Sequence, residues 1–156
     1  MTDYKNYFDA ATHKILDDIQ AMGGAPDQIR DRHNFVVSLR DGMTLPAVRM
    51  TMVPSFHQMN FYPAQGFCEP ASLALADKMG PDWDLMEIKG RDWTGGPHFF
   101  VQHRPSGRVL DITSDQYAVR GIRVPYNLGR AVKIDRRRQK VLDKYLAIMG
   151  SLERNN

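Results

Sequence analysis

The residues from 68 to 113 place the tightest limit on the fold of this chain. They open with CEPASLALADKM, a run of good helix formers with a proline in its first turn, and Gly80 follows as a stop. Three strand-like segments come next: LMEIK (85–89), HFFVQHR (98–104) and RVLDIT (108–113). Because Pro-Ser-Gly separates the last two, we expect a hairpin. The fold class is therefore α+β, with the helix that begins at Cys68 packed on an antiparallel sheet.

Amphipathic helices are expected to flank this unit at both ends of the chain. Apolar residues recur at steps of three and four over 3–22, with Thr2 placed to cap the helix and two glycines after it. An apolar stripe over 141–149 predicts a closing helix that begins near Asp135.

The segments between the first helix and Cys68 look extended. NFVVSLR (34–40) is β-prone and runs into Asp41-Gly42, a hairpin signal, so residues 47–53 are expected to form its partner strand. An irregular, aromatic- and amide-rich loop over 54–66 follows, a composition typical of segments that line sites. The Gly/Pro-interrupted residues 118–134 allow no assignment.

Composition indicates an ordinary globular protein. With 156 residues, 42% of them hydrophobic and 25% charged, residues 1–156 are expected to form one domain. The net charge is +3, but 21 Lys+Arg against 18 Asp+Glu is too even to imply nucleic acid. No apolar run approaches the roughly 20 residues of a membrane span, and the first residues do not read as a secretory signal. We expect a cytoplasmic protein that makes no membrane contact.

Metal and cofactor sites are not expected. The single cysteine excludes an internal disulfide and every multi-cysteine zinc pattern, and the five histidines contain no HExxH pair.

Cys68 is the best candidate for a catalytic residue. At a helix N-terminus the free N–H groups and the positive end of the dipole favour a thiolate over a thiol. His98 follows a Gly-Gly-Pro turn, where the backbone can approach another group closely, so we prefer it to His103 as acid/base. Asp111, thirteen residues on in an apolar strand, is the acid that would orient the imidazole.

The pairing of His98 with Asp111 depends on the hairpin register. A two-residue loop puts His98 opposite Thr113, with Asp111 as its diagonal neighbour on the same face. A three-residue loop with Gly107 as a bulge would put the two on opposite faces. Each residue alone also has a structural reading, as a buried thiol, a core histidine or a strand-end carboxylate. Their order and spacing together favour catalysis.

Other residues are candidates for the surroundings of Cys68. The backbone N–H of Cys68 is the expected oxyanion donor. A side chain of Gln65, Asn60 or Gln58 could supply the second donor, and Gln65 is our choice. Asn60, Tyr62 and Trp93 are candidates for the walls of a substrate cleft, although Trp93 could equally pack over the edge of the core.

This arrangement resembles the transglutaminase-like branch of the papain-type cysteine enzymes. The likeness lies in Gly66-Phe67-Cys68 entering a helix, in His98-Phe99-Phe100-Val101 as the histidine strand, and in GRVLDIT (107–113), which is similar to the family's Asp-Pro-Thr with Ile112 in place of proline. The resemblance spans about residues 60 to 115. It implies a papain/transglutaminase-like fold with Cys68 as nucleophile, His98 as acid/base and Asp111 as orienting acid.

A longer pattern, CEPAS followed by HFFVQHRPSGRVLDITSDQY and PYNLGR, resembles a group of small proteins of tailed phages and prophages. The first resemblance implies a thiol-dependent acyl-transfer enzyme that acts on an amide of a peptide or protein. The second lends no activity, but a phage origin would make a host protein the substrate and the host cytoplasm the location. Peptide or isopeptide hydrolysis, deamidation and transamidation all stay open, because all three pass through a thioester.

Two other functions compete with this interpretation. The same fold could serve as a non-catalytic phage-encoded binding protein or inhibitor, which would use the aromatic loop 54–62 and the polar segment 114–130. Nucleic-acid binding through residues 136–138 (Arg-Arg-Arg) and Lys140 is the weaker alternative, since such a run is usually the solvated face of a helix.

Overall fold

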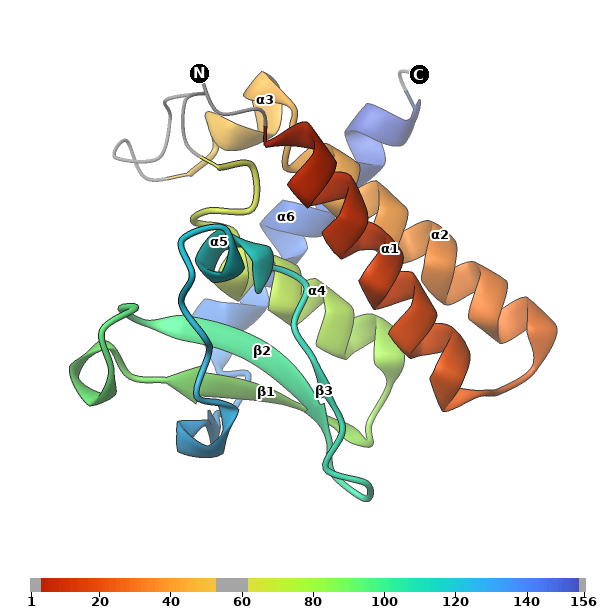
Figure 1. Ribbon diagram of the computed structural model, residues 1–156. Helices are drawn as coiled ribbons and strands as arrows, with labels where there is room; N and C mark the ends of the chain where they lie inside the picture. Colours follow the sequence, from red (N-terminus) through yellow and green to blue (C-terminus); the bar gives the residue numbers. More distant parts are fainter. Residues whose placement is uncertain (1–3, 53–61, 155–156) are drawn as a thin grey trace.

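A four-stranded antiparallel sheet lies along one side of the molecule, and helices cover one of its faces (Figure 1). The computed structural model describes residues 4–52 and 62–154. The strand order is β3-β2-β1-β4, and the strands are β1 (Trp83–Ile88), β2 (His98–His103), β3 (Val109–Leu110) and β4 (Arg130–Ala131). The predicted α+β class, with helices packed on an antiparallel sheet, is confirmed.

The helices form the second layer. In chain order they are α1 (Lys5–Met22), α2 (Pro26–Gly42), α3 (Pro46–Arg49), α4 (Cys68–Met79), α5 (Asp115–Ala118) and α6 (Arg136–Arg154), with short 3-10 turns η2 (Gly90–Asp92) and η3 (Tyr126–Leu128). Helix α4 packs directly on β1 and β2, and α6 and α2 pack on α4. Helix α1 runs antiparallel beside α2 on the far side from the sheet (Figure 1). In the part of the chain that the structure describes, no helix is long and apolar enough to cross a membrane.

Three predicted helices are confirmed. Helix α1 ends at Gly23, whose φ of 77° lies in the left-handed region that favours glycine. Helix α4 begins at Cys68 and ends before Gly80, as the sequence predicts. Helix α6 begins directly after Asp135, whose Oδ1 accepts the backbone N–H of Arg138 at 2.9 Å. The predicted cap Thr2 lies outside the described residues.

The predicted hairpin over 34–53 is wrong. Residues 34–40 belong to helix α2 and residues 46–49 to helix α3, while residue 53 lies outside the described part. The buried side chains Val36, Leu39 and Met43 recur at steps of three and four, which is helical spacing. Pro26 at the first position presets the backbone for a helix, so the β-branched pair in NFVVSLR is overruled by its context.

The hairpin of β2 and β3 takes the register that joins His98 to Asp111. Val101 pairs with Leu110 and Gln102 with Val109, the pairing expected for a two-residue loop. The connection is longer than that loop, because Gly107 N–H donates to His103 O at 2.8 Å and closes a turn over 104–107. Strand β3 also ends earlier than the predicted 108–113, since the chain turns away after Leu110 toward α5.

The sheet is covered on both faces. Alternate strand residues such as Leu85 and Val101 face the main core beneath the helices. Met86 and Phe100 face a smaller cluster that is completed by Tyr117 in α5 and by Val124 in the segment that follows α5. That irregular segment, for which the sequence allows no assignment, therefore serves as the lid of the second face.

A buried ion pair links the helical layer to the segment after β3. Arg40 in α2 is fully buried and forms two hydrogen bonds with the Asp115 carboxylate, at 2.8 and 2.9 Å. Its other donors reach Thr12 Oγ1, Phe8 O and Ile112 O, each at 2.8 Å, so all five guanidinium N–H groups are used. The Tyr62 hydroxyl donates to Asp115 as well.

This ion pair predicts a large and specific loss of stability. Replacing Arg40 with Met should lower the free energy of unfolding by about 3–5 kcal/mol, because Asp115 is left as an uncompensated buried charge. The measurement is chemical denaturation, and the double variant Arg40→Met/Asp115→Leu should regain part of the loss. Breaking the exposed pair Lys14–Asp18 by Lys14→Met is the control, with a change within about 0.5 kcal/mol. A loss below about 1 kcal/mol for Arg40→Met would contradict this role.

Candidate active site

His98 and Asp111 form a buried pair at the end of the sheet where β2 begins. His98 Nε2 lies 2.6 Å from Asp111 Oδ2, and the two side chains are 0% and 3% exposed. Because a carboxylate only accepts hydrogen bonds, Nε2 carries the proton of this bond. The predicted pairing of the two residues is therefore present, and it leaves the other ring nitrogen, Nδ1, for a different partner.

Cys68 lies near enough to the imidazole to raise its pKa. Burial by itself lowers the pKa of His98, but the charge of Asp111, the hydrogen bond to it, and a hydrogen bond and charge from Cys68 together raise that pKa to about 9. Nδ1 is buried and has no well-aligned hydrogen-bond partner within the described residues. Contacts of this kind are often long or poorly aligned in unliganded sites. The imidazole thus lies between a carboxylate and a thiol.

Helix α4 brings Cys68 to this place. Ser72, one turn after Cys68 on the same face of the helix, donates its hydroxyl hydrogen bond to Phe99 O in β2 at 3.1 Å. Ahead of the helix, the buried Arg49 donates to Pro63 O at 2.7 Å and lies over the Phe67 ring. These contacts fix the helix start from both sides, so the position of the thiol is set by packing.

Asp111 is itself held by two groups besides the imidazole. The Tyr126 hydroxyl donates to Oδ2 at 2.8 Å, and the backbone N–H of Thr113 donates to Oδ1 at 3.2 Å. Sequence reasoning missed Tyr126, which stands in the PYNLGR segment fifteen residues after Asp111. The aromatic residue in that segment was the available signal, but its irregular backbone gave no way to place it.

Aromatic rings enclose the imidazole. Tyr117 meets His98 edge to face, with ring centroids 4.8 Å apart, and Trp93 lies 6.4 Å from it. Trp93 is anchored by its indole N–H, which donates to Gly96 O at 2.6 Å, and a Cβ at Gly95 would meet the indole at 2.2 Å. The turn before β2 therefore needs glycine for this close approach. Trp93, a candidate for the cleft wall, lies beside the imidazole.

The remaining predicted site residues lie in different places. Tyr62 is buried and bonded to Asp115, so the structure places its side chain in the core and not on a cleft wall. Gln65 lies half-buried in the turn that leads to Cys68, and its role as oxyanion donor stays a prediction. Asn60 lies outside the described residues. His103, the histidine that we set aside, contacts Ser106 and Trp83 at the other end of β2.

The charged groups of the site also affect Tyr117, the ring that meets His98. Burial, and then the charges of Cys68 and Asp111, raise the pKa of Tyr117, so its hydroxyl stays protonated.

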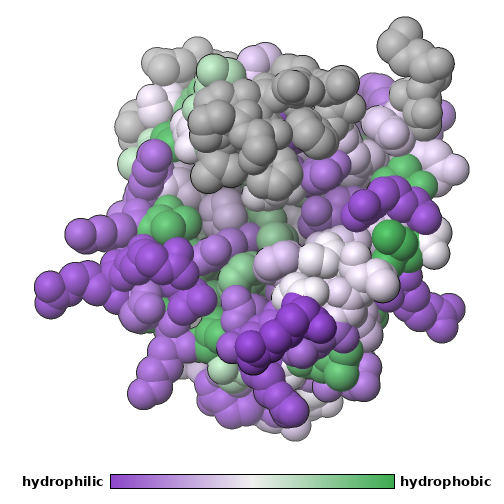
Figure 2. Space-filling view, turned by 90° about the vertical axis from the view of Figure 1, so that its left-hand side faces the viewer, coloured by the Kyte–Doolittle hydropathy of each residue, from purple (hydrophilic) through white to green (hydrophobic). Residues whose placement is uncertain are grey.

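The face of the molecule at the His98 end of the sheet carries mostly hydrophilic side chains around small, separate apolar areas (Figure 2). Among the described residues, no group of three or more His, Cys, Asp or Glu could hold a metal ion.

No family model, curated protein or solved structure gives a significant match to this chain. A function for this chain is therefore inferred from the geometry of its site.

The raised pKa of His98 predicts a pH-dependent part of the stability. A histidine in the unfolded chain titrates near 6.5, so protonation of His98 favours the folded state. This stabilisation is complete below about pH 6.5 and is lost as the pH rises through about 9. In a Cys68→Ala background, where Asp111 alone raises the pKa of His98, the free energy of unfolding should still fall as the pH rises above about 6.5. Asp111→Asn should flatten the decline, because Asp111 makes the largest contribution that raises the pKa.

The matched control for this experiment is His103→Asn, which removes the other histidine of β2 and should keep the original decline. An equally steep decline with and without the Asp111 carboxylate would contradict the assignment.

Proposed function

We propose that this protein is a thiol-dependent acyl-transfer enzyme that acts on an amide, with a papain/transglutaminase-like arrangement of its site. Cys68 is the nucleophile, His98 the acid/base and Asp111 the acid that orients the imidazole. One observation carries the proposal: a fully buried imidazole bonds a carboxylate through Nε2, which leaves Nδ1 for the thiol at the start of α4, and that thiol also raises the pKa of the imidazole.

The first half of the reaction follows from this arrangement. With a pKa near 9, His98 is protonated at neutral pH. In the proposed reaction this imidazolium stabilises the negative charge of the sulfur that attacks. The sulfur attacks the amide carbon, and the electron pair of the C=O bond moves onto oxygen. When that pair returns, the C–N bond breaks and His98 gives its Nδ1 proton to the leaving amine. The product is a thioester on Cys68.

The start of helix α4 supplies donors for the developing oxyanion. The first N–H groups of a helix have no acceptor within it, and Cys68 is the first residue of α4. Pro70 occupies the third position, where its missing N–H costs nothing. The Gln65 side-chain amide is the proposed second donor.

The second half needs a nucleophile that loses a proton to the now neutral His98. Water releases a carboxylic acid, which is hydrolysis of a peptide or isopeptide bond or deamidation of a side chain. An amine gives a new amide, which is transamidation. Either attack restores the Cys68 thiolate and the imidazolium. We propose a peptide or protein as the acyl donor, a host protein if the chain is phage-encoded, and the cytoplasm, where a single thiol stays reduced, as the place of action.

Alkylation of Cys68 by iodoacetamide tests the proposal. The wild-type thiol should react at pH 7 about tenfold faster than a free cysteine, because a neighbouring imidazolium activates a thiol as a nucleophile. His98→Asn should remove this advantage, and His103→Asn, the matched control on the same strand, should keep it. Mass spectrometry of the alkylated residue gives the rate, with Cys68→Ala as the blank.

A wild-type rate no faster than that of free cysteine would end the enzyme proposal. If Cys68→Ala left the biological activity intact, that result would support the alternative that the protein is a non-catalytic binding protein or inhibitor.

A further inference from the structure

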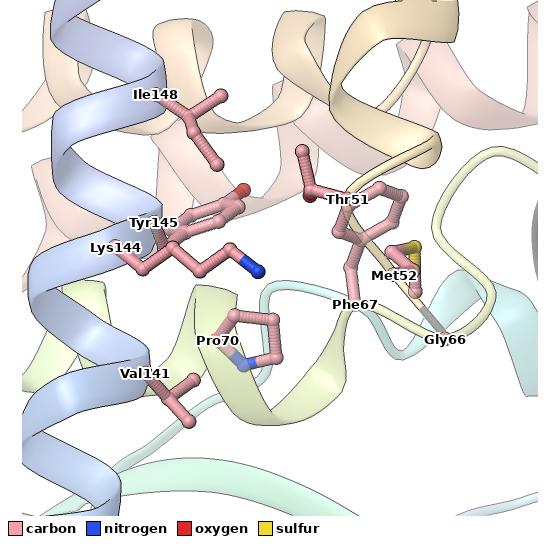
Figure 3. A pocket seen from close by; sticks show the side chains of 9 residues that line it. All are labelled: Thr51, Met52, Gly66, Phe67, Pro70, Val141, Lys144, Tyr145 and Ile148. Atoms are coloured by element: carbon pink, nitrogen blue, oxygen red, sulfur yellow. The ribbon is translucent and has the colours of Figure 1, made fainter. Parts of the chain in front are cut away.

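A second feature lies beside the nucleophile: a cavity of about 280 Å³ between α6, the turn at 51–52 and the start of α4 (Figure 3). Its walls are largely apolar and are formed by Met52, Phe67, Pro70, Val141 and Ile148. An apolar cavity of about 150 Å³ already binds benzene in another protein, and drug-sized ligands occupy about 300 Å³ or more. The size suits one large side chain.

Two polar groups distinguish this cavity from a packing defect. The Tyr145 hydroxyl is buried, in a residue that is only 4% exposed, and it has no hydrogen-bond partner among the described residues. Such a group has lost its water without gaining a protein partner, which is a measurable cost in the free protein. The Lys144 amine, on an exposed residue, points into the same space from α6 (Figure 3). The lining of the cavity therefore includes an unpartnered hydrogen-bond donor, Tyr145, and a cation, Lys144.

We propose that this cavity is a subsite for an apolar side chain of a peptide substrate that carries a carboxylate next to that side chain. The proposal rests on the acyl-transfer function and names its substrate class. The side chain fills the apolar cavity, a carbonyl oxygen of the peptide accepts the Tyr145 hydrogen bond, and the carboxylate pairs with Lys144.

The position of the cavity sets the distance from the attacked amide. Phe67 and Pro70 stand on either side of Cys68 in the sequence, but Cys68 shares the face of Ser72 toward β2, and Pro70 is turned about 200° from it. The thiol and the cavity are thus about one helix width apart, on the order of 10 Å. An extended chain advances about 3.3 Å per residue, so the apolar residue lies about three residues from the attacked amide.

The test uses the Cys68→Ala variant, which cannot turn over, and N-acetyl-L-leucinate as the probe. This molecule combines a branched side chain, an acetamide carbonyl and a carboxylate. NMR titration of the backbone amides should give saturable shifts at 66–70 and 141–148, with half-saturation on the order of millimolar. N-acetylglycinate, which lacks the side chain, should bind at least about tenfold more weakly.

Two substitutions separate the polar contacts. Tyr145→Phe should weaken binding by about three- to tenfold without lowering the Tm, since the hydroxyl has no partner to lose in the free protein. Lys144→Gln should weaken the binding of N-acetyl-leucinate but leave the binding of the uncharged N-acetyl-leucinamide unchanged. Lys140→Gln, one turn earlier on α6 and outside the cavity, is the matched control and should alter neither.

The proposal is overturned if no saturable shift appears at these residues, if Tyr145→Phe binds the probe as the parent does, or if the two lysine variants behave alike. These failures are distinct from failure of the catalytic proposal. Binding in Cys68→Ala needs no reactive thiol, and alkylation of wild-type Cys68 needs no occupied cavity.

Discussion

The buried pair of Arg40 and Asp115 is the constraint on which the arrangement of the molecule depends. A guanidinium out of water is costly unless every donor is used, and here all five are, by α1, by the segment after β3 and by Asp115 itself. Tyr62 ties the approach to α4 to the same carboxylate. This ion pair thus holds helices α1 and α2 against two segments: the one before Cys68, through Tyr62, and the one after Asp111, through Asp115.

That constraint explains how short, irregular segments can hold a precise site. Asp111 lies four residues before Asp115 and directly after a two-residue strand, so the sheet alone would position it weakly. The Arg40 contact with Ile112 O, together with Tyr126 and the Thr113 N–H, holds the carboxylate against His98. Burial strengthens this contact. Burial by itself lowers the pKa of His98, but the charge of Asp111, the hydrogen bond to it and the contribution of Cys68 raise that pKa to about 9.

The sequence predicted those parts of the molecule whose causes are local. The helix that starts at Cys68 follows from propensity and from the glycine that ends it. The sequence left two registers open for the hairpin, and the structure has the one that joins His98 to Asp111. Residues 34–40 of helix α2 were mistaken for a strand because a contact that stabilises the helix is tertiary: Arg40 pairs with Asp115, 75 residues away. Tyr126 and Tyr145 were missed for the same reason. The role of Tyr126 depends on a hydrogen bond to Asp111, and that of Tyr145 on a buried hydroxyl without a partner, and both are visible only in the folded chain.

The central claim is that Cys68, His98 and Asp111 act as one unit, and a double-mutant cycle on the alkylation rate of Cys68 tests it most directly. If Asp111 acts only through the imidazole, Asp111→Asn slows alkylation in the wild-type background and has no further effect once His98 is replaced by Asn. Equal slowing by Asp111→Asn in both backgrounds would show that the carboxylate and the imidazole act independently, and it would contradict the account.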